Sequence, residues 1–211
     1  MRSIRILSLA LLPAIAIAPA AFAQDSSSDA GTAAGKRIAV VGSLTHMEPS
    51  DDVLDGFKAD GGPAPTLSAS WYATDNFAVE LWGAADKFDH RVRADGVGKV
   101  GTVEQQPIAL SAQWHFGQAD QVFRPFVGVG YYESNFSNEQ IAGFDGPIGI
   151  ETAKGAIGTV GLDMNINETW FARTDLRYMH ARPELTLGGS TTGQELKFDP
   201  WTVGVGLGAR F

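Results

Sequence analysis

Apolar and polar residues alternate along most of this chain, and the pattern is clearest over its last eleven positions, residues 201–211. Apolar side chains stand there at every second position, namely Trp201, Val203, Val205, Leu207, Ala209 and Phe211. Thr202, Arg210 and three glycines stand between them. Because successive side chains of a strand point to opposite faces of the sheet, the segment predicts a β-strand with one apolar face.

The same two-residue period occurs in seven further segments, which raises the expected number of strands to eight. These segments are residues 37–45, 66–71, 77–82, 108–116, 124–131, 159–164 and 170–178. A helical period is supported nowhere after residue 23, and no later stretch has the roughly 18 consecutive apolar residues that suggest a transmembrane helix. The sequence therefore predicts an all-β fold.

The connections between these segments alternate strictly between short and long. Short connections lie near residues 74–76, 117–121 and 165–168, and long ones near residues 49–62, 89–102, 135–152 and 182–195. Bacterial outer-membrane barrels have short periplasmic turns and long extracellular loops, whereas a soluble β-sandwich has no reason to sort its connections in this way. We therefore predict an eight-stranded antiparallel transmembrane β-barrel with both termini in the periplasm.

Aromatic residues mark both ends of the expected strands. Those beside the short connections are Trp71, Phe77, Trp114, Phe116, Trp170 and Phe211, and those at the opposite ends are Tyr131, Tyr178 and Trp201. Two aromatic girdles of this kind occur at the membrane interfaces of outer-membrane barrels. The alternative is a soluble β-core with scattered aromatic residues.

The first 23 residues have the features of a cleaved signal peptide. Arg2 and Arg5 precede an apolar stretch at residues 6–18, and Ala21-Phe22-Ala23 matches the small-x-small pattern of a cleavage site. An N-terminal membrane anchor is the alternative, but the apolar stretch is short and proline interrupts it. The mature protein would begin at Gln24 and lie in the outer membrane, in contact with lipid and lipopolysaccharide.

The composition of the remaining chain limits the classes of function that the protein can have. Removing residues 1–23 leaves 211 − 23 = 188 residues, a length typical of one domain. Residues 24–36 are small and polar and are predicted to form a flexible lead, and residues 37–211 are predicted to form the barrel domain. Fourteen basic and 24 acidic residues give a net charge of 14 − 24 = −10, so nucleic acid is not an expected partner. The chain has no cysteine, which excludes disulfides and cysteine-ligated metals.

Several blocks of residues resemble the outer-membrane protein W (OmpW) family. Residues 71–81 (WYATDNFAVEL) are similar to that family's YMATDN turn and the strand after it, and residues 113–117 with 123–130 are similar to its QWYFG and FRPYVGAG hairpin. Residues 199–201 (DPW) and 208–211 (GARF) resemble its ending. Residues 104–108 depart from its usual His-rich segment, and the long loops match poorly.

The resemblance implies an eight-stranded barrel whose narrow, partly hydrophobic lumen passes small apolar molecules across the outer membrane. Members of the family also respond to stress or serve as bacteriocin receptors, so a structural barrel or a phage or bacteriocin receptor without transport is an open alternative. The family has no assigned covalent chemistry. A terminal Phe211 after alternating Val203, Val205, Leu207 and Ala209 also matches the signal that the barrel-assembly machinery recognises.

Polar residues on the opposite strand faces are expected to point into the lumen. Trp82, Arg124 and Asp163 are among the residues expected on the inward face. The expected polar network consists of Glu80, Gln113, His115, Arg173, Asp175, Arg177 and Arg210. Eight strands leave room only for side chains or one small ligand, so a wide aqueous porin is excluded. Because an unpaired buried charge is costly, we predict that Asp175 is the central acceptor for the arginines. The network either plugs the barrel or forms a polar floor below an apolar pocket.

Small hydrophobic ligands are predicted to reach the lumen past Leu54 and Phe57, which stand in an otherwise acidic loop. These side chains either fold into the mouth or pack against the base of the loop, and Trp82 is the expected constriction beneath them. No metal or cofactor is expected, because the four histidines are scattered. A lipid A-modifying enzyme is the remaining alternative, but Ser111 and His115 stand about 13 Å apart along their strand, beyond hydrogen-bond reach.

Overall fold

The computed structural model describes most of the chain after the expected signal peptide and lead. The described residues are 35–49, 57–94, 96, 98–141, 148–150, 152–180, 184–187, 190–195 and 199–211. The predicted signal peptide and residues 24–34 of the predicted lead lie outside them. Throughout these ranges the regular elements are β-strands. A helix long and apolar enough to cross a membrane is not found among them.

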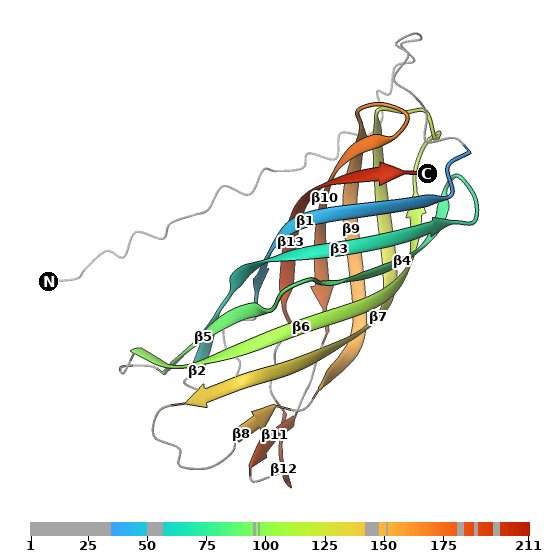
Figure 1. Ribbon diagram of the computed structural model, residues 1–211. Coiled ribbons are helices and arrows are strands. Elements are labelled where there is room, and N and C mark those ends of the chain that lie inside the picture. Colours follow the sequence, from blue (N-terminus) through green and yellow to red (C-terminus); the bar gives the residue numbers. More distant parts are fainter. Residues whose placement is uncertain are drawn as a thin grey trace, which may run out of the picture.

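Eight long strands form a closed antiparallel barrel, which confirms the predicted fold. Each strand pairs with the next long strand along the chain, and the last pairs with the first (Figure 1). They are β1 (Ile38–Glu48), β3 (Gly62–Tyr72), β4 (Phe77–Ala84), β6 (Gly98–His115), β7 (Phe123–Ile141), β9 (Ala153–Asn165), β10 (Trp170–Met179) and β13 (Trp201–Arg210). Closure pairs the backbone of every barrel strand on both sides, which a strand in lipid requires.

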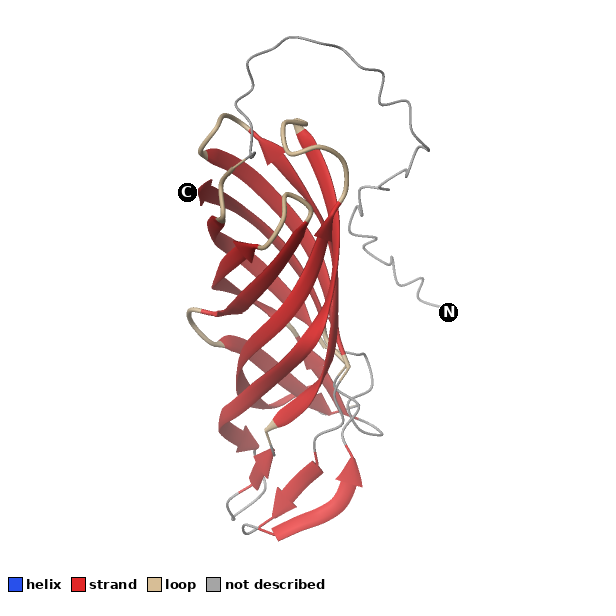
Figure 2. Ribbon diagram, turned by 90° about the vertical axis from the view of Figure 1, so that its right-hand side faces the viewer, coloured by secondary structure: helices blue, strands red, loops and turns tan. Residues whose placement is uncertain are grey.

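The ranges predicted to be long loops contain further strands, which the sequence pattern did not reveal. β2 (Phe57–Asp60) pairs with β5 (Phe88–Ala94), and β5 pairs with the first half of β6. β8 (Ile148–Ile150), β11 (Glu184–Leu187) and β12 (Ser190–Glu195) form a separate sheet. All five lie at the end of the barrel opposite the C-terminus, as their labels show in Figure 1 and as the turned view confirms for that end of the barrel (Figure 2). Strands outside the membrane need no apolar outer face, so they lack the alternation that marks the others.

Side chains fix the short turns at the other end of the barrel. Asn76 donates to the carbonyl oxygens of His115 (2.7 Å) and Gly117 (2.8 Å), which ties one turn to the next. In the last short turn, the Asn167 side chain accepts a hydrogen bond of 2.8 Å from the backbone of Trp170. The Arg37 backbone donates to the carbonyl of Phe211 over 2.8 Å and so closes the barrel where the chain ends.

The outward face of the barrel is apolar. Along β3 exposed and buried residues alternate without a break, and large apolar side chains such as Val129 (72% exposed) and Leu207 point away from the lumen. Exposed Trp71, Trp114 and Trp170 lie near the short turns, and exposed Trp201 lies at the opposite end. A contiguous apolar surface of this kind is unfavourable in water, which indicates that it faces lipid.

The lumen is layered along the barrel axis. The loop-side cluster is apolar and consists of Met47, Ala64, Trp82, Phe88, Ala109, Tyr132, Ala153, Ile157 and Met179. The turn-side cluster lies near the short turns and consists of Ala39, Val41, Tyr72, Ala78 and Phe171. Along β4, Glu80 stands between Ala78 and Trp82 on the inward face, so a polar layer separates the two clusters.

Candidate functional site

The polar layer is supplied mainly by the inward face of β10. Arg173, Asp175 and Arg177 follow one another at every second position, between Phe171 of the turn-side cluster and Met179 of the loop-side cluster. All three are buried, as expected for alternate residues on the lumen face of a closed barrel. We call Glu80, Asp163, Arg173, Asp175, Arg177 and Arg210 the charged layer.

Glu80 of β4 accepts hydrogen bonds from two arginines of β10. The Arg173 Nη1 atom lies 2.9 Å from Glu80 Oε2, and the Arg177 Nη1 atom lies 2.8 Å from Glu80 Oε1. Each carboxylate oxygen therefore has a charged donor of its own. Charge-assisted hydrogen bonds of this length are about twice as strong as neutral ones, and they fix both guanidinium groups across the lumen.

Asp163 of β9 is the central acceptor of the charged layer. Arg173 binds it in a bidentate manner, with Nε 2.6 Å from Oδ1 and Nη2 2.9 Å from Oδ2. Arg210 donates to the same Oδ2 atom over 2.9 Å and to the side-chain oxygen of Asn165. Arg173 and Asp163 are direct partners in the β9–β10 register, which explains their close geometry.

The prediction that Asp175 is the central acceptor is wrong. Among the described residues Asp175 accepts a hydrogen bond only from Arg177, whose Nε lies 2.8 Å away, and Arg210 donates to Asp163 instead. The strand register explains the difference, since Asp175 is paired with Gly204 of β13 and Arg210 lies further along that strand, toward the short turns.

Charges balance within the layer, because its three guanidinium groups face its three carboxylates. Removing charges from water is expensive, and pairing with good geometry is what makes such a layer tolerable inside a barrel. Arg124 lies nearer the short turns and donates to the backbone oxygen of Asp75 over 2.6 Å. The charged side chains of the layer are therefore neutralised by one another inside the barrel.

Aromatic rings cover the guanidinium groups. The Arg173 guanidinium carbon lies 4.6 Å from the centre of the Phe126 ring, and that of Arg210 lies 3.7 Å from the Phe171 ring. Both rings lie over inward-facing glycines, Gly161 and Gly208, where an added Cβ would clash with them. The glycines thus make room for the aromatic layer that packs against the arginines.

Gln113 and His115 of the predicted network lie beside the charged layer. His115 Nε2 is 3.3 Å from Gln113 Oε1 and 3.4 Å from the Tyr72 hydroxyl, and its ring stacks on Phe126 with 4.9 Å between centres. The Ser111 hydroxyl has no hydrogen-bond partner among the described residues. A Ser–His pair is therefore not formed at this position.

The structure describes the three residues that were predicted to admit and constrict ligands to different extents. Trp82 is buried in the loop-side cluster, and the Arg177 guanidinium carbon lies 4.7 Å from the centre of its ring. Leu54 lies outside the described residues. The backbone of Phe57 forms part of β2, paired with Ala94, while its side chain lies outside what the structure describes.

The predicted assembly residues lie on the last strand, β13, and at Phe211 directly after it. Val203, Val205, Leu207 and Phe211 are exposed on the outer wall. Ala209 shares their face by register but is only 9% exposed, in a position between Val40 and Trp170 on the neighbouring strands.

The sequence reasoning missed most of the loop-side cluster. Met47, Phe88, Ile157 and Met179 are apolar and point inward, whereas Trp82 was the one residue of this cluster that the sequence pattern placed on the inward face. A sequence signal does exist: inward apolar residues stand at both ends of β10, at Phe171 and Met179, and the charged residues lie between them. Over the described ranges, no group of three or more His, Asp or Glu residues is placed to hold a metal ion.

Comparisons with known proteins agree with the outer-membrane barrel fold described above. The model of the OmpW family matches residues 34–211. Outer membrane protein W of Escherichia coli (strain K12) is 32% identical over 165 residues, which are 75% of this chain and 77% of that protein. The crystal structure of the outer membrane protein OprG from Pseudomonas aeruginosa matches with a TM-score of 0.72 and 23% identity, covering 87% of this chain and 99% of that one. The NMR structure of the E. coli outer membrane protein W gives a TM-score of 0.56 at 27% identity, covering 83% and 98%.

Proposed function

Because the chain belongs to the OmpW family of outer-membrane proteins, as its sequence motifs predict, we propose that it passes small hydrophobic molecules across the outer membrane. The protein lies in the bacterial outer membrane. Short turns of such barrels face the periplasm, so the loop-side cluster faces the exterior of the cell. The layered lumen is the observation that carries the proposal.

The loop-side cluster supplies an apolar site at the outer end of the lumen. Met47, Trp82, Phe88, Ile157 and Met179 are all buried there and present few polar groups to a solute. An apolar molecule gains about 25 cal/mol for each Å² that it removes from water, and an ion gains nothing comparable. The cluster therefore favours hydrophobic over ionic cargo.

The charged layer determines where such a molecule can leave. An apolar solute that moved further along the axis would have to separate Glu80 from Arg173 and Arg177, and breaking buried ion pairs of this kind is strongly unfavourable. We therefore assign to the solute a route that passes Leu54 and Phe57, reaches Trp82 and leaves sideways through the wall into the membrane.

A receptor or structural barrel without transport is the second candidate. The observation that favours it is the same charged layer, because the salt bridge between Arg173 and Glu80 crosses the bore. On this hypothesis the layer only rigidifies the barrel, and the long connections at the outer end carry the function. The two candidates differ in whether the loop-side cluster exchanges with an apolar solute.

Conductance of the purified barrel in planar bilayers tests the proposal. The wild-type protein should show a small conductance with weak ion selectivity, and naphthalene should reduce it by occupying the loop-side cluster. Trp82→Ala removes the largest side chain of that cluster, so it should raise the conductance and weaken the block by naphthalene.

Trp114→Ala is the matched control, since Trp114 is a half-exposed tryptophan on the lipid-facing side of the wall. It should leave both the conductance and the block unchanged. If the purified barrel neither conducts nor binds naphthalene, and cells lacking the protein take up hydrophobic compounds normally, transport is excluded and the receptor or structural candidate remains.

A further inference from the structure

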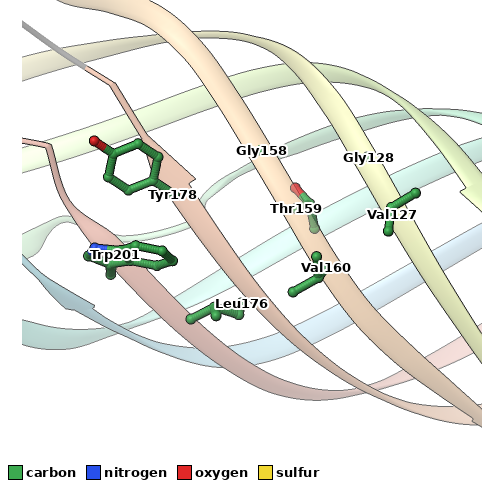
Figure 3. A pocket seen from close by; sticks show the side chains of 8 residues that line it. All are labelled: Val127, Gly128, Gly158, Thr159, Val160, Leu176, Tyr178 and Trp201. Atoms are coloured by element: carbon green, nitrogen blue, oxygen red, sulfur yellow. The ribbon is translucent and has the colours of Figure 1, made fainter. Parts of the chain in front are cut away.

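The outer wall of the barrel carries a hollow of about 350 Å³ (Figure 3). It spans β7, β9, β10 and β13 and is separate from the lumen clusters described above. Its lining is almost entirely apolar and consists of Val127, Gly128, Gly158, Thr159, Val160, Leu176, Tyr178 and Trp201.

The hollow exists because Gly158 stands on the outward face of β9 between larger neighbours. Its direct partners are Val129 on β7 and Tyr178 on β10, both of which carry large side chains. A Cβ atom added at Gly158 would meet no atom within 4 Å. The missing side chain thus leaves a slot between these larger side chains of the apolar wall.

An aromatic pair closes one side of the slot. The rings of Tyr178 and Trp201, direct partners on β10 and β13, lie 4.7 Å apart between centres at 45°. Trp201 begins β13 at the outer end of that strand, where tryptophan and tyrosine mark the interface between lipid tails and headgroups. Val160 and Leu176 continue the slot toward the middle of the membrane.

A basic residue stands above the slot on the same strand face. Lys154 is four residues from Gly158 on the outward face of β9, a separation of about 13 Å. Its ammonium group lies 3.3 Å from a carboxylate oxygen of Glu133, and the two side chains stay 52% and 44% exposed. A lysine in this position can reach an anionic headgroup while an attached tail lies below it.

From these features we propose that the slot binds one acyl chain of an anionic outer-leaflet glycolipid of the lipid A type, with a headgroup phosphate on Lys154. Lipopolysaccharide is part of the surroundings of outer-membrane barrels. Lipid tails gain no hydrophobic free energy by leaving other lipid, so the affinity must come from close packing in the slot and from the charge of Lys154. The inference is independent of transport through the lumen.

Lipid retained by the barrel purified in mild detergent, measured by native mass spectrometry, tests the proposal. Gly158→Leu puts a side chain into the slot, and its Cβ atom would meet no other atom within 4 Å, so it should reduce the retained lipid A by at least fivefold. Gly42→Leu is the matched control: Gly42 is an exposed, lipid-facing glycine on β1 with only Leu67 within 4 Å of an added Cβ, at 3.8 Å. It should retain lipid A as the wild type does. Lys154→Gln should reduce retention with the slot left open.

A second experiment distinguishes lipid A from phospholipid as the source of the bound acyl chain. The delipidated barrel is offered lipid A or phosphatidylethanolamine with chains of equal length, and the Gly158→Leu barrel is first shown to fold by its heat-modifiable mobility. Preferential binding of lipid A that Gly158→Leu abolishes supports the proposal. Equal binding of both lipids, equal retention by Gly158→Leu and Gly42→Leu, or no retained lipid in the wild type overturns it.

Discussion

Arg173 and Glu80 are joined by a salt bridge of 2.9 Å across the lumen, although 93 positions separate them in the chain. Arg173 lies on β10 and Glu80 on β4, which are four strands apart in either direction around the barrel. The pair therefore connects opposite walls. Because the same Arg173 also binds Asp163 in a bidentate manner, one guanidinium group couples both sides of the barrel.

The first prediction concerns the rank of the carboxylates in the charged layer. Asp163→Asn should lower the free energy of unfolding by about 3–5 kcal/mol, because it weakens contacts with both Arg173 and Arg210 in a buried site. Asp175→Asn should cost less, because within the described part of the chain Asp175 is hydrogen-bonded only to Arg177, and Arg177 keeps Glu80. Urea unfolding of the two variants in lipid vesicles measures the difference. Equal costs, or a larger cost for Asp175→Asn, would contradict this assignment.

The second prediction concerns the glycine beneath the Phe171 ring. Gly208→Ala should lower the free energy of unfolding by about 1–3 kcal/mol, because the new methyl group clashes with a ring that cannot move without disturbing Arg210. Gly42→Ala is the control, since its methyl group would meet only ordinary contacts on the lipid-facing wall. The same urea titration compares them. A cost for Gly208→Ala no larger than that for Gly42→Ala would mean that the ring is free to shift.

The sequence predicted which face of each strand these residues occupy, and the structure places them there. The two-residue period puts Glu80, Arg173 and Arg177 on inward faces, where the structure has them buried. The eight segments with this period predicted eight strands, and the structure confirms the eight-stranded barrel. Strand pairing decides which charges meet, and pairing depends on the register between strands, which alternation within one strand does not encode. That is why Asp175 was predicted as the central acceptor and Asp163 has that place.

The outer end of the barrel was less predictable for a different reason. β5 and the first half of β6 continue the wall beyond the apolar band, with exposed Asp89, Arg91 and Arg93 on the outward side of β5. Water tolerates such residues, so the pattern of apolar and polar positions no longer distinguishes a strand from a loop. An apolar pocket above the polar residues was expected only as one of two alternatives. Trp82 was the one residue of the loop-side cluster assigned to it, so the other inward apolar positions of that cluster were missed.

The third prediction concerns pH and His90, which points inward from β5, beyond the apolar band. Burial lowers the pKa of His90 to about 4 from 6.5, although a hydrogen bond with Gln105 (3.0 Å) opposes the shift. Between these values the unfolded chain binds a proton that the folded state excludes, so this contribution to stability is complete above about pH 6.5 and is lost as the pH falls toward 4. The loss amounts to about 3 kcal/mol.

His90→Gln should remove this part of the pH dependence. Urea unfolding of the wild type and the variant at several pH values between 7 and 4 gives the difference between the two curves, which cancels the contribution of the carboxylates common to both. The wild type should lose more stability than the variant over this interval. Parallel curves would show that His90 is protonated in the folded barrel or that the outer end of β5 opens before the barrel unfolds.

The last prediction separates assembly from stability at Phe211. Its side chain is 65% exposed, whereas its backbone accepts hydrogen bonds from Arg37 and Ile38 and donates to Ile38. Phe211→Asp keeps the backbone contacts and removes the terminal aromatic side chain. If the barrel-assembly machinery reads that side chain, the variant should accumulate unfolded in cells, yet show nearly wild-type urea unfolding once it has been refolded into vesicles.

Phe116→Asp is the control for that experiment, since Phe116 is another exposed aromatic residue near the short turns but directly follows β6, whereas Phe211 directly follows the last strand. It should assemble at a rate closer to that of the wild type. An aspartate at this end of the barrel lies near water in the folded state, and the substitution leaves the terminal segment that the assembly machinery is expected to recognise unchanged. Heat-modifiable mobility on gels, followed over time after induction, measures assembly of both variants. Normal assembly of Phe211→Asp would show that the backbone closure with Arg37 and Ile38, and not the aromatic side chain, is what the last residue contributes.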